Sequence, residues 1–280
     1  MMDPNKYSSY IFDCDGVLWK GHRDIPGSFE VLQALKSNGK KLYFLSNNST
    51  KTPEELSQQI SSHGYPALPE EIYCSGAAIS KYLKRKHPNA KRLYLIGTDQ
   101  LKAQLAAHGY EILHISNIEQ SIITSFEDIE RFATGNPVDS VVVGRDMRFD
   151  YNMGYMASLY IQNGASLISA NGDSGLVLNS GKTIPGCGPL TAFLEIATRT
   201  KAEIVGKPST FILDIIIEEN NLEKETTVLI GDSMDSDIKV GKDCNVDTLL
   251  VLSGVTSVED LPRYDFSPNF ILPNLASIFN

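Results

Sequence analysis

Short apolar runs alternate with helix-like segments along most of this chain, and this alternation constrains the fold more than any other feature. Between the first two runs, Phe29, Leu32 and Leu35 fall at helical spacing, and Gly39 follows as a stop signal. A strand–helix repeat of this kind predicts an α/β fold whose core is a Rossmann-like, doubly wound parallel sheet. The strand-like runs are Tyr10–Phe12, Leu42–Leu45, Leu93–Ile96, Val141–Val143, Leu167–Ile168, Ile204–Val205, Val228–Ile230, Leu249–Leu252 and Phe270–Leu272.

The spacing of the runs predicts two domains. Ser46 and Lys207, which follow two of the strand-like runs, are separated by 160 residues, whereas one strand–helix–strand crossover needs roughly 30. We therefore expect a second α/β domain, residues 77–184, inserted into a core made of residues 1–76 and 185–280. The Gly/Pro-rich stretch 184–189 is a candidate hinge between them.

Composition excludes several classes of protein. The chain carries 25 basic and 34 acidic side chains, a net charge of −9, and duplex binding depends on neutralising phosphates, so no nucleic-acid partner is expected. No apolar run approaches the ~18–20 residues that a membrane span needs, so no membrane partner is expected either. Widely spaced cysteines without a secretory signal predict free thiols in the cytoplasm. These cysteines are Cys14, Cys74, Cys187 and Cys244.

Four of the predicted strands run directly into polar clusters. In a doubly wound sheet, ligands bind beyond the carboxyl ends of the strands, so these clusters are the candidate site. The clusters are Asp13-Cys14-Asp15-Gly16, Ser46-Asn47-Asn48-Ser49-Thr50, Gly206-Lys207-Pro208-Ser209 and residues 231–237, which read GDSMDSD.

Asp13 and Asp15 are spaced for covalent chemistry on phosphorus. One carboxylate can attack and form an acyl phosphate, which divides one difficult displacement into two easier ones. The other can protonate the leaving oxygen and later deprotonate water. The same Asp-x-Asp-Gly pattern begins calcium loops, but position 5 of such a loop would be Val17 and position 12 would be Asp24, so an EF-hand is excluded.

The second acidic cluster predicts a magnesium site. A carboxylate nucleophile and a phosphate dianion repel each other, and a hard divalent cation removes that repulsion. We expect Asp13, the Asp15 carbonyl and Asp232 to hold Mg²⁺, with Asp237 or Asp235 behind them. The alternative is that Asp232 is a turn residue and that Asp235 and Asp237 cap a helix.

Basic and neutral polar residues complete the predicted site. Lys207 can hold a phosphate oxygen and keep Asp13 ionised. Ser46, Asn47 and Asn48 offer a hydroxyl, amides and backbone N–H groups that can cradle an anion, although helix capping explains the same residues. In the insert, Arg145 and Arg148 either face an anionic ligand or lie on the solvated surface; the sequence favours the surface for each.

At this point the motifs resemble those of a known family. The segments FDCDGVLW, FLSNNSTK, VGKPS and GDSMDSDI, in this order, are similar to the four motifs of the haloacid dehalogenase superfamily. The large insert between the second and third motifs resembles the C2-type cap. Within the superfamily the likeness is to the 4-nitrophenylphosphatase type, which includes phosphoglycolate and pyridoxal phosphate phosphatases.

The resemblance implies a role for each site residue. Asp13 is expected as the nucleophile and Asp15 as the general acid and base, and Asp15 favours a phosphatase because the dehalogenase branch lacks this second aspartate. Ser46 and Lys207 are expected to bind the phosphoryl group, with Asn47 and Asn48 beside the substrate. Relatives with this cap commonly form homodimers through it, so a homodimer is expected.

The chain departs from the family pattern at two places. The fourth motif commonly reads Gly-Asp-Arg-Leu, but Ser233 and Met234 occupy its last two positions here. The Asn171-Gly172-Asp173 segment resembles the substrate-specificity loop, yet Leu176 replaces the histidine of pyridoxal phosphatases. This difference favours a phosphoglycolate-like substrate or a broader range of small substrates, with pyridoxal phosphate as the alternative.

Three functions are consistent with these residues. The first is a Mg²⁺-dependent phosphatase that acts on small-molecule phosphate esters. The second is a receiver-like signalling module, which also combines an acidic Mg²⁺ site, a phospho-accepting aspartate, a hydroxyl and a lysine. The third is a metabolite-binding protein without catalysis. Asp15 and the long insert count against the receiver.

Overall fold

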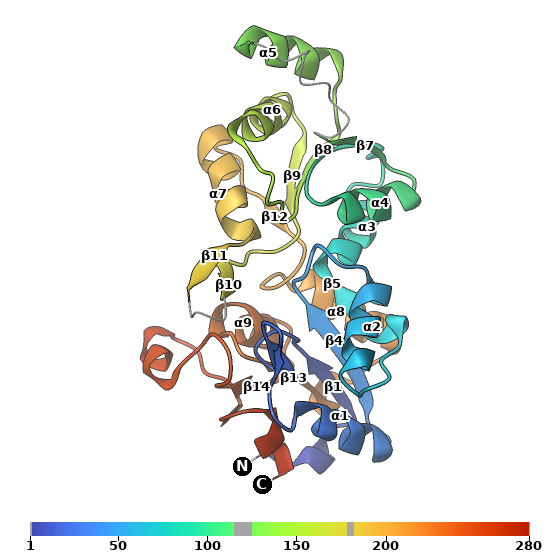
Figure 1. The fold of residues 1–280 in the computed structure, drawn as a ribbon, viewed down its shortest axis with the longest axis vertical. Helices are drawn as coiled ribbons and strands as arrows, with labels where there is room; N and C mark the ends of the chain where they lie inside the picture. Colours follow the sequence, from blue (N-terminus) through green and yellow to red (C-terminus); the bar gives the residue numbers. More distant parts are fainter. Residues whose placement is uncertain (1, 115–124, 178–181, 280) are drawn as a thin grey trace.

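The fold positions its candidate site with two parallel sheets, one above the other (Figure 1). The computed structural model describes residues 2–114, 125–177 and 182–279. The lower, six-stranded sheet has the order β15-β14-β13-β1-β4-β5 and is parallel throughout; we call it the core sheet. Its strands are β1 (Ser9–Phe12), β4 (Lys41–Ser46), β5 (Ile72–Cys74), β13 (Thr227–Gly231), β14 (Asp247–Val251) and β15 (Phe270–Leu272).

The register of the core sheet places three strand ends level with one another. Phe12 of β1 lies opposite Phe44 of β4 on one side and Ile230 of β13 on the other. The chain leaves β1 toward β4 and β5, and later returns on the other side of β1 to form β13. This reversal of direction is the place where a doubly wound sheet binds its ligand.

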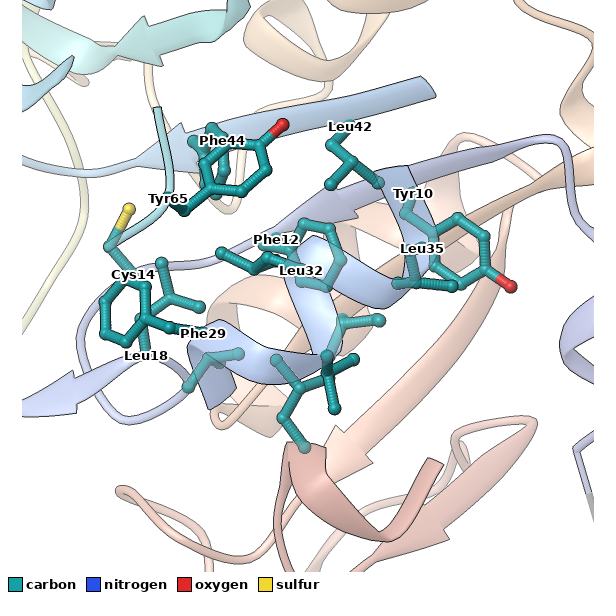
Figure 2. Close-up of a cluster of buried hydrophobic side chains, with 14 of the residues drawn as sticks. Tyr10, Phe12, Cys14, Leu18, Phe29, Leu32, Leu35, Leu42, Phe44 and Tyr65 are labelled. Carbon is teal, nitrogen blue, oxygen red and sulfur yellow. The ribbon is translucent and has the colours of Figure 1, made fainter. Parts of the chain in front are cut away.

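Apolar side chains fix the helices of the core. α1 buries Phe29, Leu32 and Leu35, the predicted helical stripe, against β1 and β4 (Figure 2). Burying each such side chain contributes about 1.5–3 kcal/mol. The core helices are α1 (Ser28–Ser37), α2 (Pro53–Ser62), α3 (Ser75–Lys86), α8 (Phe211–Asn220) and α9 (Lys239–Asp243).

The inserted unit, which we call the cap, has its own parallel sheet in the order β12-β9-β8-β6-β7. Its strands are β6 (Arg92–Ile96), β7 (Glu111–His114), β8 (Ser140–Val143), β9 (Ser166–Ser169) and β12 (Glu203–Ile204). Its helices are α4 (Asp99–Ala107), α5 (Phe126–Gly135), α6 (Tyr151–Gln162) and α7 (Cys187–Thr198). Two antiparallel hairpins lie outside both sheets: β2 (Trp19–Lys20) with β3 (Arg23–Asp24), and β10 (Gly175–Val177) with β11 (Thr183–Pro185).

The cap sheet extends beyond the predicted boundary at residue 184. β12 pairs with β9, so the prediction that Ile204–Val205 is a core strand is wrong. α7 packs on α6, and its Leu194 is buried in the apolar cluster of the cap. The physical reason is that the apolar face of α7, with Leu190, Phe193 and Leu194, packs into that cluster of the cap.

The predicted α/β class with a doubly wound parallel core and an α/β insert agrees with this architecture, and each of the nine predicted runs overlaps a strand. The short strands β5 and β7 and both hairpins were not predicted. Within the part of the chain that the structure describes, the helices are too short or too polar to cross a membrane.

Candidate active site

The carboxyl ends of β1, β4 and β13 open into a pocket of about 480 Å³ that the cap closes from above. Alternation along the chain after β1 sorts the side chains there. Asp13 and Asp15 line the pocket, whereas Cys14 between them is fully buried in the apolar cluster beneath. The strand period of two thus presents both predicted catalytic carboxylates to one cavity.

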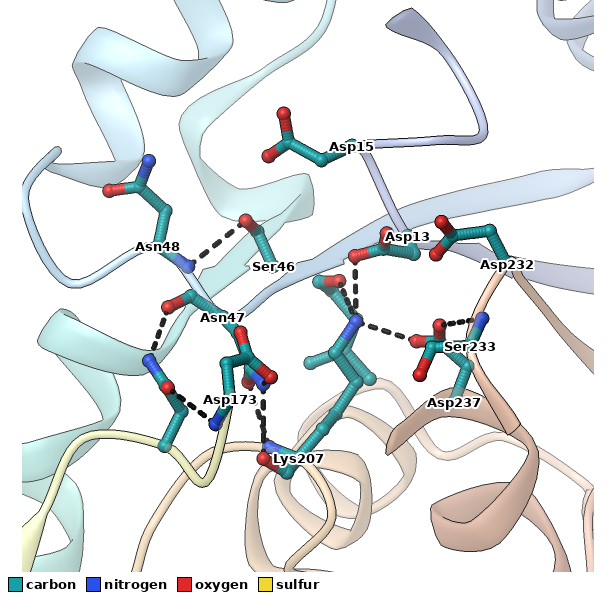
Figure 3. A network of polar contacts seen from close by, with 12 residues as sticks. Asp13, Asp15, Ser46, Asn47, Asn48, Asp173, Lys207, Asp232, Ser233 and Asp237 are labelled. Atoms are coloured by element: carbon teal, nitrogen blue, oxygen red, sulfur yellow. Dashed lines mark hydrogen bonds and ion pairs between the residues drawn. The ribbon is translucent and has the colours of Figure 1, made fainter. Parts of the chain in front are cut away.

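Lys207 lies between two carboxylates at the floor of the pocket (Figure 3). Its Nζ is 2.6 Å from Asp13 Oδ1 and 2.6 Å from Asp237 Oδ1, and it also donates to the Leu45 carbonyl oxygen at 3.3 Å. The side chains of Lys207, Asp13 and Asp237 are only 3%, 10% and 1% exposed. Burial alone would lower the pKa of Lys207, but the two carboxylates outweigh burial and raise it.

Three buried carboxylates share this single ammonium group. Oxygens of Asp13, Asp232 and Asp237 lie within 4.8 Å of one another. Burial raises the pKa of Asp13 well above its usual range, although Lys207 opposes the shift. Burial, and then the charge of Asp237, raise the pKa of Asp232 to about 7, against the Val255 N–H that donates to Asp232 Oδ2 at 2.7 Å.

This cluster fits a hard divalent cation. Its donors are all carboxylate oxygens, which Mg²⁺ prefers, and one ammonium leaves negative charge uncompensated. Asp237 is already engaged through both oxygens, because Oδ1 accepts from Lys207 and Oδ2 accepts from the Ser233 N–H at 3.1 Å. Asp13 and Asp232 therefore remain the carboxylates free to face a cation, with Asp237 behind them.

A local departure from α-helical geometry aims Asp237 at the site. Residues Met234–Ile238 form one π-helical turn directly after β13 and before α9. Such turns are uncommon and occur frequently at functional sites. In this turn the Asp237 side chain accepts from Lys207 Nζ and from the Ser233 N–H, and it does not cap α9.

The polar residues of the loop after β4 line the pocket and also hydrogen-bond within the loop. Ser46 Oγ accepts from the Asn48 N–H at 3.1 Å, so its own proton can be donated into the pocket. Asn48 Oδ1 accepts from the Thr50 and Lys51 N–H groups at 2.8 and 2.9 Å within the loop, whereas the cap of α2 is Thr52, whose side chain accepts from the Glu55 N–H. Both side chains line the pocket, and Asn48 stabilises the loop as well.

Asn47 joins the core to the cap. Its Oδ1 accepts from the Lys207 N–H at 2.8 Å, and its Nδ2 donates to Asp173 Oδ1 at 2.8 Å and to the Lys207 carbonyl at 3.0 Å. Asn171 Nδ2 donates to the Asn47 carbonyl at 2.7 Å. The predicted specificity segment of the cap is thus hydrogen-bonded to the second and third motifs (Figure 3).

Asp15 lies apart from the Lys207 cluster (Figure 3). Its Oδ1 accepts from Trp19 Nε1 at 2.9 Å, and Trp19 begins the β2–β3 hairpin. Desolvation raises the pKa of Asp15, and the Trp19 hydrogen bond opposes the shift. A carboxyl group whose pKa is raised in this way is suited to donating and accepting a proton.

The two arginines of the insert lie in different surroundings. Arg145 lines the pocket together with Leu176. Arg148 is directed elsewhere and binds Asp146, Asp99 and the Gly97 carbonyl. The surface interpretation therefore holds for Arg148 and is wrong for Arg145.

Sequence reasoning missed the loop after β14. The Val255 N–H holds the Asp232 carboxylate, and Ser253 Oγ donates to the Gly16 carbonyl at 2.7 Å. A signal was present, because Ser253 and Gly254 follow the predicted run Leu249–Leu252 in the same way that the other polar clusters follow their strands.

Comparison with known proteins identifies the family. A model described as haloacid dehalogenase-like hydrolase matches residues 10–111, and a HAD-hydrolase-like model matches residues 204–278. A 4-nitrophenylphosphatase of Schizosaccharomyces pombe is 33% identical over 98% of this chain and 94% of its own length. The chain belongs to the haloacid dehalogenase-like hydrolases.

Further relatives of this hydrolase carry related names. A glycerol-3-phosphate phosphatase of Mus musculus is 35% identical over 96% of this chain and 88% of its own length. A chloroplastic phosphoglycolate phosphatase 1A of Arabidopsis thaliana is 32% identical over 97% of this chain and 76% of its own length. Among solved structures, a single mutant of a thermostable NPPase from Geobacillus stearothermophilus is 31% identical, with a TM-score of 0.81 over 97% and 98% of the two chains.

These matches confirm the predicted family, the Rossmann-like fold class and the prediction of an enzyme. They span both the core and the cap of this chain. The receiver-like module and the non-catalytic binding protein are therefore rejected as alternatives.

Proposed function

We propose that this hydrolase is a Mg²⁺-dependent phosphatase that cleaves small phosphate monoesters through a phosphorylated Asp13. The observation that carries the proposal is the position of Lys207 between Asp13 and Asp237, at 2.6 Å from each. Of the two carboxylate oxygens of Asp13, Lys207 contacts Oδ1. Within the described residues, Asp13 Oδ2 accepts no hydrogen bond. One carboxylate oxygen is thus anchored while the other is free to attack.

The residues perform the reaction in two steps. In the first, Asp13 Oδ2 forms a bond to phosphorus, the ester P–O bond breaks, and Asp15 gives its proton to the leaving oxygen. In the second, Asp15 takes a proton from water, the water oxygen bonds to phosphorus, and the Asp13–phosphorus bond breaks to release phosphate. Lys207 and the Ser46 hydroxyl hold the phosphoryl oxygens throughout.

Asp13, the Asp15 carbonyl and Asp232 would hold Mg²⁺, with Asp237 behind them. When bound, the cation screens the charge of the phosphoryl group from the attacking carboxylate. Asn47 and Asn48 would lie beside the substrate. A 2-phosphoglycolate-like metabolite is the proposed substrate class, with pyridoxal phosphate as the alternative.

The test is kcat/KM for 4-nitrophenyl phosphate with Mg²⁺ and with a chelator, in the wild type and in Asp13→Asn. We expect chelation to abolish turnover and Asp13→Asn to lower kcat by more than about a thousandfold, as removal of a nucleophile does in other enzymes. Substantial turnover by a folded Asp13→Asn enzyme would refute the proposal.

We also propose that the chain forms a homodimer through its cap. The outer cap helices and the loop before α6 expose large apolar side chains, and such surfaces commonly mark protein–protein contacts. Light scattering should give twice the chain mass, and Tyr151→Asp should give a monomer; a monomeric wild type would refute this. The exposed residues are Phe126 (60%), Met147 (89%), Tyr151 (66%) and Ile196 (81%).

A cytoplasmic location is proposed from the thiols. All four cysteines are unpaired and buried, a state that a reducing compartment maintains. Fractionation of cells that express the tagged chain would test this location.

A further inference from the structure

Among the residues the structure describes, Arg145 is the cationic residue of the pocket whose side chain has no protein partner. Lys207 is held by Asp13 and Asp237, and Lys20 donates to the Gly254 carbonyl at 3.4 Å. The guanidinium of Arg145 has no hydrogen bond or ion pair with any described residue. A pocket-lining cation without a protein partner is available to a ligand.

The backbone at Arg145 is fixed where the cap meets the core. The Arg145 N–H donates to Ser49 Oγ at 3.1 Å, and Ser49 belongs to the loop after β4. The preceding Gly144 donates to the Ile96 carbonyl at 2.7 Å, and a Cβ at Gly144 would lie 2.7 Å from a Leu101 methyl. The end of β8 is therefore packed tightly, and Arg145 is anchored at the pocket wall.

The charge of Arg145 is not neutralised by its neighbours. The adjacent Asp146 is buried and binds Arg148, which in turn binds Asp99. The other charged cap residue in the pocket, Asp173, accepts a hydrogen bond from Asn47. Arg145 also acts on Asp15, since it is one of the cations that oppose the burial-driven rise in the pKa of Asp15.

We propose that Arg145 binds a carboxylate on the leaving-group half of the substrate, so that the enzyme prefers phosphate esters of hydroxy acids over esters of uncharged alcohols. The inference rests on the proposed phosphatase function, because the position of Asp15 defines the leaving-group side. A guanidinium presents paired N–H donors that match a carboxylate in two parallel hydrogen bonds. A pocket of about 480 Å³ accommodates such small acids.

The first test compares kcat/KM for 2-phosphoglycolate with kcat/KM for glycerol 3-phosphate. We expect the wild type to favour 2-phosphoglycolate, and Arg145→Gln to lower the ratio of the two constants by about 10- to 100-fold, the usual loss when one partner of a charge pair is removed. Arg145→Lys should restore part of the ratio. Arg148→Gln is the matched control, and it should leave the ratio as in the wild type.

The second test measures binding without turnover. In Asp13→Asn, calorimetry should show that adding Arg145→Gln weakens the affinity for 2-phosphoglycolate by about tenfold or more. An unchanged ratio and an unchanged affinity in Arg145→Gln, or a wild type that favours glycerol 3-phosphate, would overturn the assignment. If the wild type hydrolyses neither of these esters nor 4-nitrophenyl phosphate, the phosphatase proposal fails, while calorimetry still decides whether Arg145 binds the acid.

Discussion

Lys207 is the residue on which the charge balance of the site depends. It is the only ammonium that the structure shows in contact with the buried carboxylates of Asp13 and Asp237. Lys207→Met should therefore abolish activity and also destabilise the fold by about 3–5 kcal/mol, because it leaves buried charges unpaired. Asp13→Asn should abolish activity without that loss, because it removes one of the crowded carboxylates.

Both variants should lose activity, but only Lys207→Met should lose stability. Urea unfolding without Mg²⁺ measures the free energy of unfolding of each variant. Equal stability of Lys207→Met and Asp13→Asn would show that Lys207 does not compensate the carboxylates.

Asp146 makes the stability of the cap depend on pH. Burial alone would raise its pKa, but contacts with His114 and Arg148 outweigh burial and lower the pKa from 3.8 to about 2. A carboxyl group with a lowered folded-state pKa stabilises the protein above its unfolded pKa of about 4 and loses that effect as the pH falls toward about 2.

Asp146→Asn should therefore unfold more easily than the wild type at pH 7, by about 1–2 kcal/mol. The difference should shrink steadily below about pH 4. Denaturant unfolding at several pH values measures it, and a difference that stays constant down to about pH 2.5 would argue against a charged role for Asp146.

At the scale of elements, sequence reasoning located strands well and assigned one of them to the wrong sheet. Runs such as Val228–Ile230 are apolar because both faces of a parallel strand are buried. β12 is only two residues long, Glu203–Ile204, and nothing in so short a run indicates its partner. Its neighbour in the cap, β9, is fixed by tertiary contacts that local patterns do not encode.

The site was more predictable than the sheet pairing. Asp13, Ser46 and Asp232 could be found because strand ends collect at one edge of a sheet. The contacts of Val255 with Asp232 and of Ser49 with Arg145 could not, since each joins segments that meet only after folding.

α7 packs on the cap, so we expect it to unfold together with the cap sheet. Amide hydrogen exchange tests this. Leu194 is fully buried against the cap sheet, so Leu194→Ala should cost about 2–5 kcal/mol. Amide protection should fall in α7, β8 and β9 together and remain in β1 and β13. The matched control is Leu32→Ala in α1, which should lower protection in β1 and β4 instead. Loss of protection in β1 and β13 on Leu194→Ala would place α7 with the core.

At the scale of the whole molecule, the excess acid of the chain is concentrated in the core. Residues 77–184 carry 11 basic and 10 acidic side chains of the 25 and 34 in the chain, so the remaining residues carry 14 basic and 24 acidic side chains, a net charge of −10. A cation bound at Asp13 and Asp232 should therefore stabilise the native state.

Saturating Mg²⁺ at about 100 times its Kd should add about 2.7 kcal/mol to the free energy of unfolding and raise Tm accordingly. Asp232→Asn should lose most of this gain, while Asp235→Asn, beside the cluster, should keep it. An equal rise in Tm in all three proteins would mean that Mg²⁺ binds elsewhere.

The most direct test of the phosphorylated Asp13 intermediate uses Asp15→Asn with 4-nitrophenyl phosphate and Mg²⁺. The 4-nitrophenolate leaves without needing a proton, whereas the water step still needs a base, so the phosphorylated enzyme should accumulate. Acid quenching and peptide mass spectrometry should find one phosphoryl group on Asp13, together with a stoichiometric burst of 4-nitrophenol. Steady turnover with no phosphorylated peptide, or a phosphoryl group on another residue, would contradict the proposed mechanism.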